Sequence, residues 1–172
     1  PLIEQCTFDI DVVYTWVDSN DPHWQEMLNE HREPDTAASS DGSVLHDRFT
    51  DRGELKYSIR SLLRYAPWVR HVYVVTNCKP PDWFDESNER VRWVYHDEIM
   101  DPAHLPTFNS HAIETSIHRV PNLSEHFLYF NDDMAIGRPV RPELFFTPNG
   151  LTRADRKSTR LNSSHPVLSY AV

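Results

Sequence analysis

The sequence lacks the features that mark several common classes of protein. Its two cysteines, Cys6 and Cys78, are too few for a disulfide framework or a four-ligand zinc site. It has no glycine-rich phosphate loop, no HExxH motif, and no apolar run near the roughly 20 residues that span a bilayer. Positive charge is scarce, because 17 Lys and Arg stand against 26 Asp and Glu, for a formal charge of −9. We therefore expect no nucleic-acid partner and no transmembrane segment.

The two ends of the chain differ from its middle. The first residue is Pro1 rather than methionine, which indicates a fragment or a processed N-terminus. Residues 156–172, RKSTRLNSSHPVLSYAV, show no helix or strand period and resemble a translated sequencing adaptor; the alternative is a genuine polar extension. We expect residues 1–155 to form one domain or the larger part of one, and residues 156–172 to be a non-native tail that packs poorly.

The apolar pattern between these ends predicts an α/β fold. Short runs of β-branched and aromatic residues alternate with stripes of helical period, which is typical of a mostly parallel sheet with flanking helices. The expected strands lie near residues 11–15, 72–76, 91–94 and 127–130, and the expected helices near residues 54–65 and 111–120.

Two groups of titratable residues are candidates for chemistry. Asp132 and Asp133 directly follow the expected strand 127–130, and in open α/β sheets ligands bind outside the carboxyl ends of strands. Such a pair could hold a hard cation, Mg²⁺ or Mn²⁺, against an anionic substrate. His111, Glu114 and His118 fall on one face of the expected helix 111–120. The plainer alternatives are a polar turn and a solvated helix face.

Further polar residues suit a nucleotide-recognition site. The first strand ends in a turn-rich segment containing Asp18 and Asp21, the usual position of a nucleotide loop in doubly wound folds. Trp16 before it is either core or a surface on which a base stacks. Lys56 and Arg60 belong to a basic stripe on the helix 54–65, which is either a diphosphate clamp or a solvated face.

Three long segments carry a family resemblance. DIDVVYTWVDSNDP (residues 9–22), ELKYSIRSLLRYAPWVRHVYVVTN (54–77) and LPTFNSHAIETSIHRVPNLSEHFLYFNDDM (105–134) resemble conserved regions 1 and 2 of the Stealth family. This family includes bacterial capsular polysaccharide phosphotransferases and the catalytic subunit of the lysosomal-enzyme N-acetylglucosamine-1-phosphotransferase. Residues 1–155 would then be a partial Stealth-type catalytic domain, with a truncated Rossmann-like or glycosyltransferase A-like fold.

The resemblance implies a phosphotransferase that acts in capsule or exopolysaccharide synthesis. A sugar 1-phosphate would pass from a UDP-sugar, typically a UDP-hexose, to a hydroxyl of an acceptor glycan, giving a phosphodiester and UMP. The protein would work in the cytoplasm, either free or at the inner face of the bacterial membrane. The family usually has Gly after the Asn or Asp of its first motif, where this chain has Ser19 after Asp18.

The resemblance also assigns roles to individual residues. Glu114, Asp132 and Asp133 match acidic active-site residues of the family. The chemistry of phosphoryl transfer adds two roles: Asp132 and Asp133 would be metal ligands, and His111 or His118 would be the base unless the base lies beyond Asp155, where the third and fourth regions would be. The candidate substrate-binding residues are Trp16, Asp18, Asp21, Lys56, Arg60 and Asn109. We expect Glu114, Asp132 and Arg60 to meet in one cleft.

Three other functions remain open from the sequence. One is a metal-dependent glycosyltransferase that releases UDP, and another is a metal-dependent hydrolase built on the His111, Glu114 and His118 face. The third is an inactive fragment that binds a nucleotide sugar, since the family's later regions are missing. The released nucleotide, UMP or UDP, would separate the first of these from the phosphotransferase.

Overall fold

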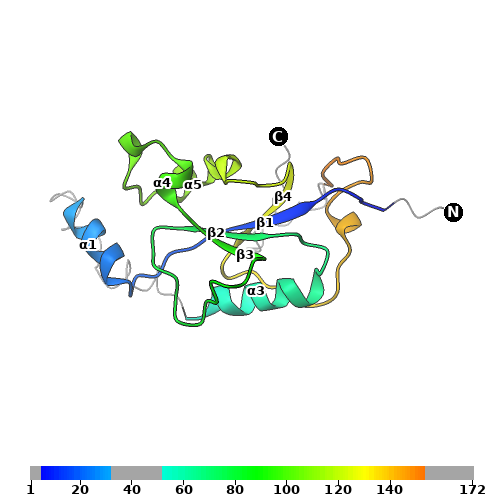
Figure 1. Ribbon diagram of the computed structural model, residues 1–172, viewed down its shortest axis with the longest axis horizontal. Coiled ribbons are helices and arrows are strands. Elements are labelled where there is room, and N and C mark those ends of the chain that lie inside the picture. The colour runs from blue at the N-terminus through cyan, green and yellow to red at the C-terminus, as the bar shows by residue number, and fades with distance from the viewer. Residues whose placement is uncertain (1–4, 32–51, 154–172) are drawn as a thin grey trace, which may run out of the picture.

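The protein is a parallel β-sheet with helices on both faces, as a computed structural model shows for residues 5–31 and 52–153 (Figure 1). The proposed adaptor-derived tail, residues 156–172, lies outside the described residues. The strands are β1 (Ile10–Thr15), β2 (Val72–Thr76), β3 (Val91–Tyr95) and β4 (His126–Asn131). Their order is β3-β2-β1-β4, and every neighbouring pair is parallel. The α/β fold predicted from the sequence is confirmed, and each expected strand is found to within one residue at each end.

Helix α3 (Glu54–Tyr65) connects β1 to β2 and covers one face of the sheet, below it in Figure 1. Its bounds coincide with the predicted helix. The side chains of Leu55, Ile59 and Leu62 form its buried stripe and pack with alternate strand residues such as Val12 and Val74. This stripe orients the helix, because the residues between its members must then face away from the sheet.

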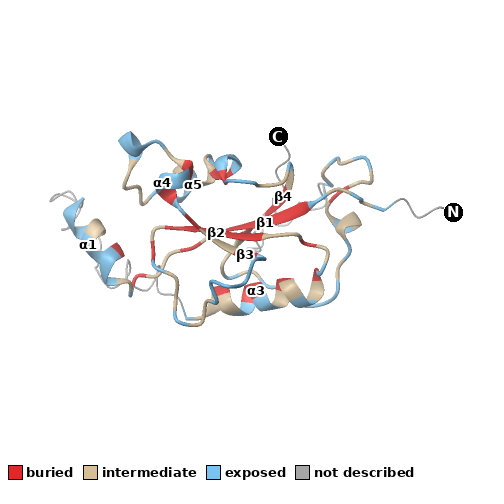
Figure 2. Ribbon diagram, viewed as in Figure 1, coloured by how far each residue is buried: buried red, intermediate tan, exposed pale blue. Residues whose placement is uncertain are grey.

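The opposite face is covered by the segment between β3 and β4, which contains α4 (His96–Ile99), η2 (Pro102–His104), α5 (Ser110–Glu114) and η3 (Ile117–Arg119). A second buried cluster, with Val13, Val75, Ile117 and Val120 among its members, fills this side. Because both faces are covered, the strands read as nearly continuous apolar runs, and the buried residues follow the strands in Figure 2.

The predicted helix 111–120 is wrong in detail, because α5 ends at Glu114 and η3 begins at Ile117. Thr115 Oγ1 and Ser116 Oγ both donate to the Ala112 carbonyl oxygen, at 2.8 and 3.3 Å. Such local bonds compete with the helical ladder. The Ser116 amide donates to Ile113 rather than to residue 112, so the chain tightens into a 3₁₀ turn.

The described chain is completed by α1 (Pro22–Glu30), which follows β1, and by η4 (Pro142–Leu144) after β4. Helix α1 was not predicted. Asp21 caps it and Pro22 occupies its first turn, a combination that is a standard start signal for a helix.

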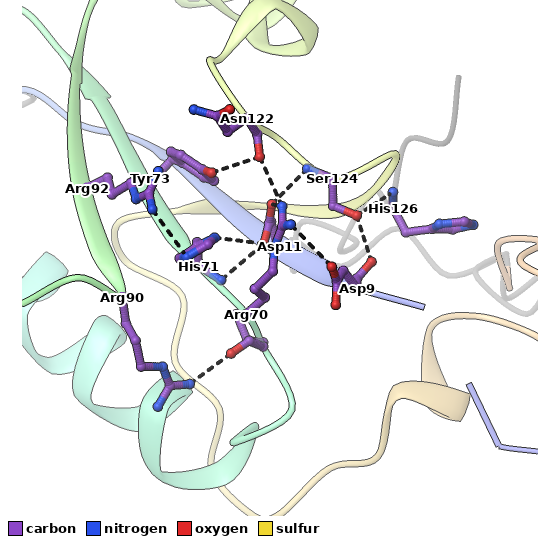
Figure 3. A network of polar contacts seen from close by, with 11 residues as sticks. Asp9, Asp11, Arg70, His71, Tyr73, Arg90, Arg92, Asn122, Ser124 and His126 are labelled. Atoms are coloured by element: carbon purple, nitrogen blue, oxygen red, sulfur yellow. Dashed lines mark hydrogen bonds and ion pairs between the residues drawn. The ribbon is translucent and has the colours of Figure 1, made fainter. Parts of the chain in front are cut away.

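The amino ends of the strands are joined by a polar network centred on Asp11 (Figure 3). Asp11 is fully buried and accepts hydrogen bonds from Arg70 Nε and Nη2, at 3.0 and 2.7 Å. It also accepts from the backbone amides of His71 and Ser124, at 3.0 and 2.7 Å. One carboxylate thereby ties β1 to the segments that lead into β2 and β4.

The strand order places a topological switch point between β1 and β4. The chain passes outward from β1 to β2 and β3, and then returns to the other side of β1 to form β4. In open α/β sheets, the crevice outside the carboxyl ends of the strands at such a point is where ligands bind. Thr15 and Asn131, which pair in register, mark that place here.

Candidate active site at the switch point

The residues that border the switch point on the α5 side form a chain of hydrogen bonds. The Tyr129 hydroxyl on β4 donates to Glu114 Oε1 at 3.2 Å. The Thr15 hydroxyl at the end of β1 lies 2.8 Å from the same phenol oxygen. Because the single Tyr129 proton is directed to Glu114, Thr15 is the donor in the second bond. Burial, assisted by the charges of Glu114 and Asp132, raises the pKa of Tyr129 to about 12, so the phenol remains a donor at neutral pH.

A cavity of about 330 Å³ opens beside this chain. His111, Glu114 and His118 line it together with Tyr129 and the apolar side chains of Ile117 and Phe127. His111 Nδ1 lies 3.6 Å from Glu114 Oε2, and the His111 side chain is 88% exposed. The structure therefore brings the three residues of the predicted helix face to one pocket, although the helix that was expected to carry them is broken.

Asp132 and Asp133 occupy the turn that leaves β4. The Met134 amide donates to the Asn131 carbonyl oxygen at 3.1 Å, which closes a four-residue turn with the two aspartates at its centre. Strand alternation would send the two side chains to opposite faces, so both could bind one cation only through such a turn of the backbone. Asp132 is half-buried and Asp133 is exposed.

Asp132 acts electrostatically on both sides of the sheet. Its charge adds to the effect of burial in raising the pKa of Tyr129, on the α5 side. It also contributes to the raised pKa of Tyr14, a buried residue of β1 on the α3 side, where burial is again the main cause. Asp132 thus lies at the carboxyl edge, where its charge acts on both tyrosines.

The chain after the aspartates is fastened to α3. Ser58 Oγ donates to the Met134 carbonyl oxygen, and the Tyr14 hydroxyl lies 2.8 Å from the same serine oxygen. Ser61 Oγ accepts from the Ile136 amide at 2.9 Å. The aspartate turn is therefore held by β4 on one side and by α3 on the other.

The donor set at this edge suits Mg²⁺ better than zinc. Among residues 5–31 and 52–153, no three His, Cys, Asp or Glu side chains gather into a group that could hold a metal ion by themselves. Magnesium commonly takes one or two carboxylates and completes its shell with water and substrate phosphates. The Asp132 and Asp133 turn could supply those carboxylates, whereas a three-ligand hydrolase site on His111, Glu114 and His118 has no such support.

The predicted rim residues have structural partners. Asp18 Oδ1 accepts from the amide and side chain of Asn20, and the Asp18 amide lies 3.3 Å from Cys78 Sγ. Asp21 caps α1 through the His23 amide and accepts from the Lys79 amide at 2.8 Å. Asn109 caps α5 through the His111 amide at 3.0 Å. These contacts shape the loops around the carboxyl edge.

Trp16 and the basic residues of α3 are placed away from the Glu114 pocket. Trp16 is 5% exposed, with its ring edge-on to Trp93 at 5.2 Å, so it belongs to the core and offers no open face to a base. Lys56 Nζ lies 6.0 Å from the Trp83 ring. Arg60 is exposed on α3. Because α3 and α5 cover opposite faces of the sheet, the expected meeting of Arg60 with Glu114 does not occur.

Sequence reasoning missed Tyr129 and Thr15. Tyr129 was counted as part of an apolar strand, although it stands two residues before Asn131 and so faces the same side of the sheet. A phenol on the same side of the strand as its polar end could have indicated that Tyr129 belongs to the site. Thr15 gave none, because its partner depends on the pairing of β1 with β4.

Comparison with known proteins points to one family. The family model described as Stealth protein CR2, conserved region 2, matches residues 48–154, and the one described as Stealth protein CR1, conserved region 1, matches residues 8–30. The exopolysaccharide phosphotransferase SCO6023 of Streptomyces coelicolor is 52% identical over 153 residues, which cover 88% of this chain and 25% of that protein. The capsular polysaccharide phosphotransferase SacB of Neisseria meningitidis serogroup A is 42% identical over 153 residues, covering 89% and 27%. The chain thus spans about a quarter of the length of the curated relatives it matches.

Proposed function

This chain belongs to the Stealth protein family, and we propose that the full-length protein transfers a sugar 1-phosphate from a UDP-sugar to a glycan hydroxyl. The product would be a phosphodiester in a capsular or exopolysaccharide, and UMP would be released. The observation that supports the proposal is the pocket at the switch point, where Glu114 is hydrogen-bonded to Tyr129, in a chain whose relatives are named phosphotransferases. Within the described residues no helix is long and apolar enough to cross a membrane. We place the protein in the cytoplasm, where a nucleotide-sugar donor would be supplied.

The proposed reaction is a nucleophilic displacement at the β-phosphorus of the donor. The acceptor oxygen forms a new bond to that phosphorus, and the bond from the phosphorus to the bridging oxygen breaks. UMP leaves with the bridging oxygen, and the hydroxyl proton passes to a base. Phosphoryl transfer depends mostly on positioning and on neutralising charge, so the site needs a cation, a base and fixed carboxylates.

The residues at the carboxyl edge can divide these tasks. Asp132 and Asp133 would hold Mg²⁺ or Mn²⁺, which neutralises charge on the donor diphosphate. Glu114 would orient the acceptor hydroxyl within the 330 Å³ pocket. His111 Nδ1 lies 3.6 Å from Glu114 Oε2, so His111 would act as the base that accepts the hydroxyl proton. The apolar Phe127 and Ile117 in the same pocket offer surface for the carbon face of a sugar ring.

Product analysis tests the proposal. The full-length protein would be incubated with a UDP-sugar, an acceptor glycan and Mg²⁺, with the nucleotide separated by chromatography and the glycan examined by ³¹P nuclear magnetic resonance. We expect UMP and phosphodiester in equal amounts. Release of UDP with no phosphorus in the glycan would instead identify a glycosyltransferase. Donor binding without any product would identify a nucleotide-sugar-binding protein.

A further inference from the structure

We infer that Tyr129 and Thr15 are positioning residues for Glu114, forming a hydroxyl relay that fixes its carboxylate at the switch point. This inference rests on the proposed role of Glu114 and extends the site to two hydroxyl residues that act through its carboxylate. The relay runs from β1 through β4 to α5, by the 2.8 and 3.2 Å contacts of the Tyr129 oxygen. It thereby links the Glu114 carboxylate to the central strand β1 and to the edge strand β4.

Glu114 needs such a link because its own helix gives it little support. Helix α5 has five residues, and Glu114 is the last of them before the chain tightens at Thr115 and Ser116. Its side chain is 34% exposed, so one side of the carboxylate is open to the pocket and to solvent. A glutamate at the end of a short helix has several accessible rotamers, and a fixed donor selects among them.

Tyr129 is suited to be that donor. Its backbone lies within β4 and pairs with Val13 of the central strand β1. The sheet therefore fixes the point from which the Tyr129 side chain extends. The phenol has few rotatable bonds, and burial keeps its proton in place. Thr15 donates its hydroxyl hydrogen to the phenol oxygen, so the phenol hydrogen is directed to Glu114 instead of to Thr15. The order of donors is therefore Thr15 to Tyr129 to Glu114.

The relay also gives the two carboxylate oxygens of Glu114 different roles. Glu114 Oε1 is occupied by Tyr129, while Oε2 faces His111 at 3.6 Å. The carboxylate is thus held by one oxygen and presents the other toward the candidate base. Removing the phenol hydroxyl would free the first oxygen and let the carboxylate turn away from His111.

The test is a set of variants in the full-length protein, assayed for kcat and KM with donor and acceptor varied separately. Tyr129→Phe should lower kcat about 10- to 100-fold, as loss of a residue that orients a reacting group typically does, with donor KM little changed. Thr15→Val should lower kcat by a smaller factor, and Thr15→Ser, which keeps the hydroxyl, should restore it. Tyr129→Phe combined with Thr15→Val should be no worse than Tyr129→Phe alone, because Thr15 acts through the phenol.

Tyr73→Phe is the matched control. Tyr73 lies on the same face of the sheet, and its hydroxyl donates to the Asn122 carbonyl oxygen at 3.1 Å, but at the amino edge (Figure 3). Its loss should lower the thermal midpoint about as much as Tyr129→Phe does and leave kcat unchanged. A purely structural role for Tyr129 would make the two variants alike in both measurements.

The outcomes separate the inference from the function on which it rests. Both nucleotides are measured, so kcat can be compared whether UMP or UDP is released, and UDP release refutes the phosphotransferase proposal alone. Glu114→Gln with wild-type kcat removes Glu114 from the mechanism and overturns the relay with it. If Glu114→Gln is impaired and Tyr129→Phe stays within twofold of wild type, the relay is wrong while the proposed function stands.

Discussion

Replacing Asp11 with alanine should destabilise the sheet strongly, although Asp11 lies at the edge opposite the candidate site. Alanine leaves the His71 and Ser124 amides without their acceptor, and each unpaired buried donor costs about 1–3 kcal/mol. The Arg70 side chain is 33% exposed, so water replaces part of what it loses and its share is small. At the middle of that range the two amides together cost about 4 kcal/mol, against the roughly 5–15 kcal/mol that holds a typical domain folded.

Amide hydrogen exchange on the full-length protein can measure this loss within the sheet. Protection of β1 and β4 amides should fall roughly 10²- to 10³-fold in Asp11→Ala, since about 1.4 kcal/mol corresponds to a factor of ten. Asp9→Ala is the control, because Asp9 contacts the same Arg70 guanidinium at 3.2 Å but its side chain is 66% exposed. The control should cost less than about 1 kcal/mol. Equal effects of the two substitutions, or a change below threefold in Asp11→Ala, would refute the reasoning.

Three further predictions follow from other parts of the structure. Asp132→Ala should lower UMP release about 10²–10³-fold while the thermal midpoint stays nearly unchanged. Chelation of divalent metal should likewise inactivate the wild-type protein, and metal-independent turnover would contradict this prediction. Burial lowers the pKa of His96 from 6.5 to about 4, so the unfolded chain binds its proton first and stability should fall as the pH drops from about 6.5 towards 4. In His96→Phe the free energy of unfolding should depend less on pH over this range. A dependence equal to that of wild type would contradict the prediction. Gly150→Ala should cost about 1–2 kcal/mol of stability or more and so lower the thermal midpoint, because Gly150 has φ +86 and a Cβ there would lie 2.7 Å from His126 Nε2. A midpoint equal to that of wild type would contradict this prediction.

The strands and α3 could be predicted because their patterns have simple physical causes. A strand covered on both faces, such as β1, must be apolar at nearly every position, and the sequence shows this directly. Asp11 is the exception within β1, and a charged residue in such a run indicates a buried partner. That partner, Arg70, is distant in sequence, so the pairing appeared only with the sheet.

The break in the helix 111–120 could not be read from apolar periodicity alone. Ile117 and Val120 are buried as the 3.6-residue pattern requires, because α5 and η3 together still turn one side to the sheet. The break depends on Thr115 and Ser116 bonding back to Ala112, an option that competes closely with a continuous helix.

Those parts of the candidate site that depend on residues adjacent in the sequence could be predicted. Those that depend on how helices and strands pack against one another could not. The Asp132 and Asp133 turn follows from strand 127–130 and its polar end. The side on which Arg60 lies depends on which face α3 covers, and the link between Glu114 and Thr15 depends on the pairing of β1 with β4. Neither is encoded in the spacing of residues along one element.

The attachment of the aspartate turn to α3 affects how natural variants of this protein should be interpreted. Ser58 and Ser61 contribute no group to the pocket, yet they hold the backbone that immediately follows Asp133. A change of either serine to a larger residue would displace the two carboxylates while leaving every expected ligand present in the sequence. Under the proposed function, an inactive variant that carries such a change should therefore be classed with active-site mutants, although an inspection of the motifs would find every candidate ligand intact.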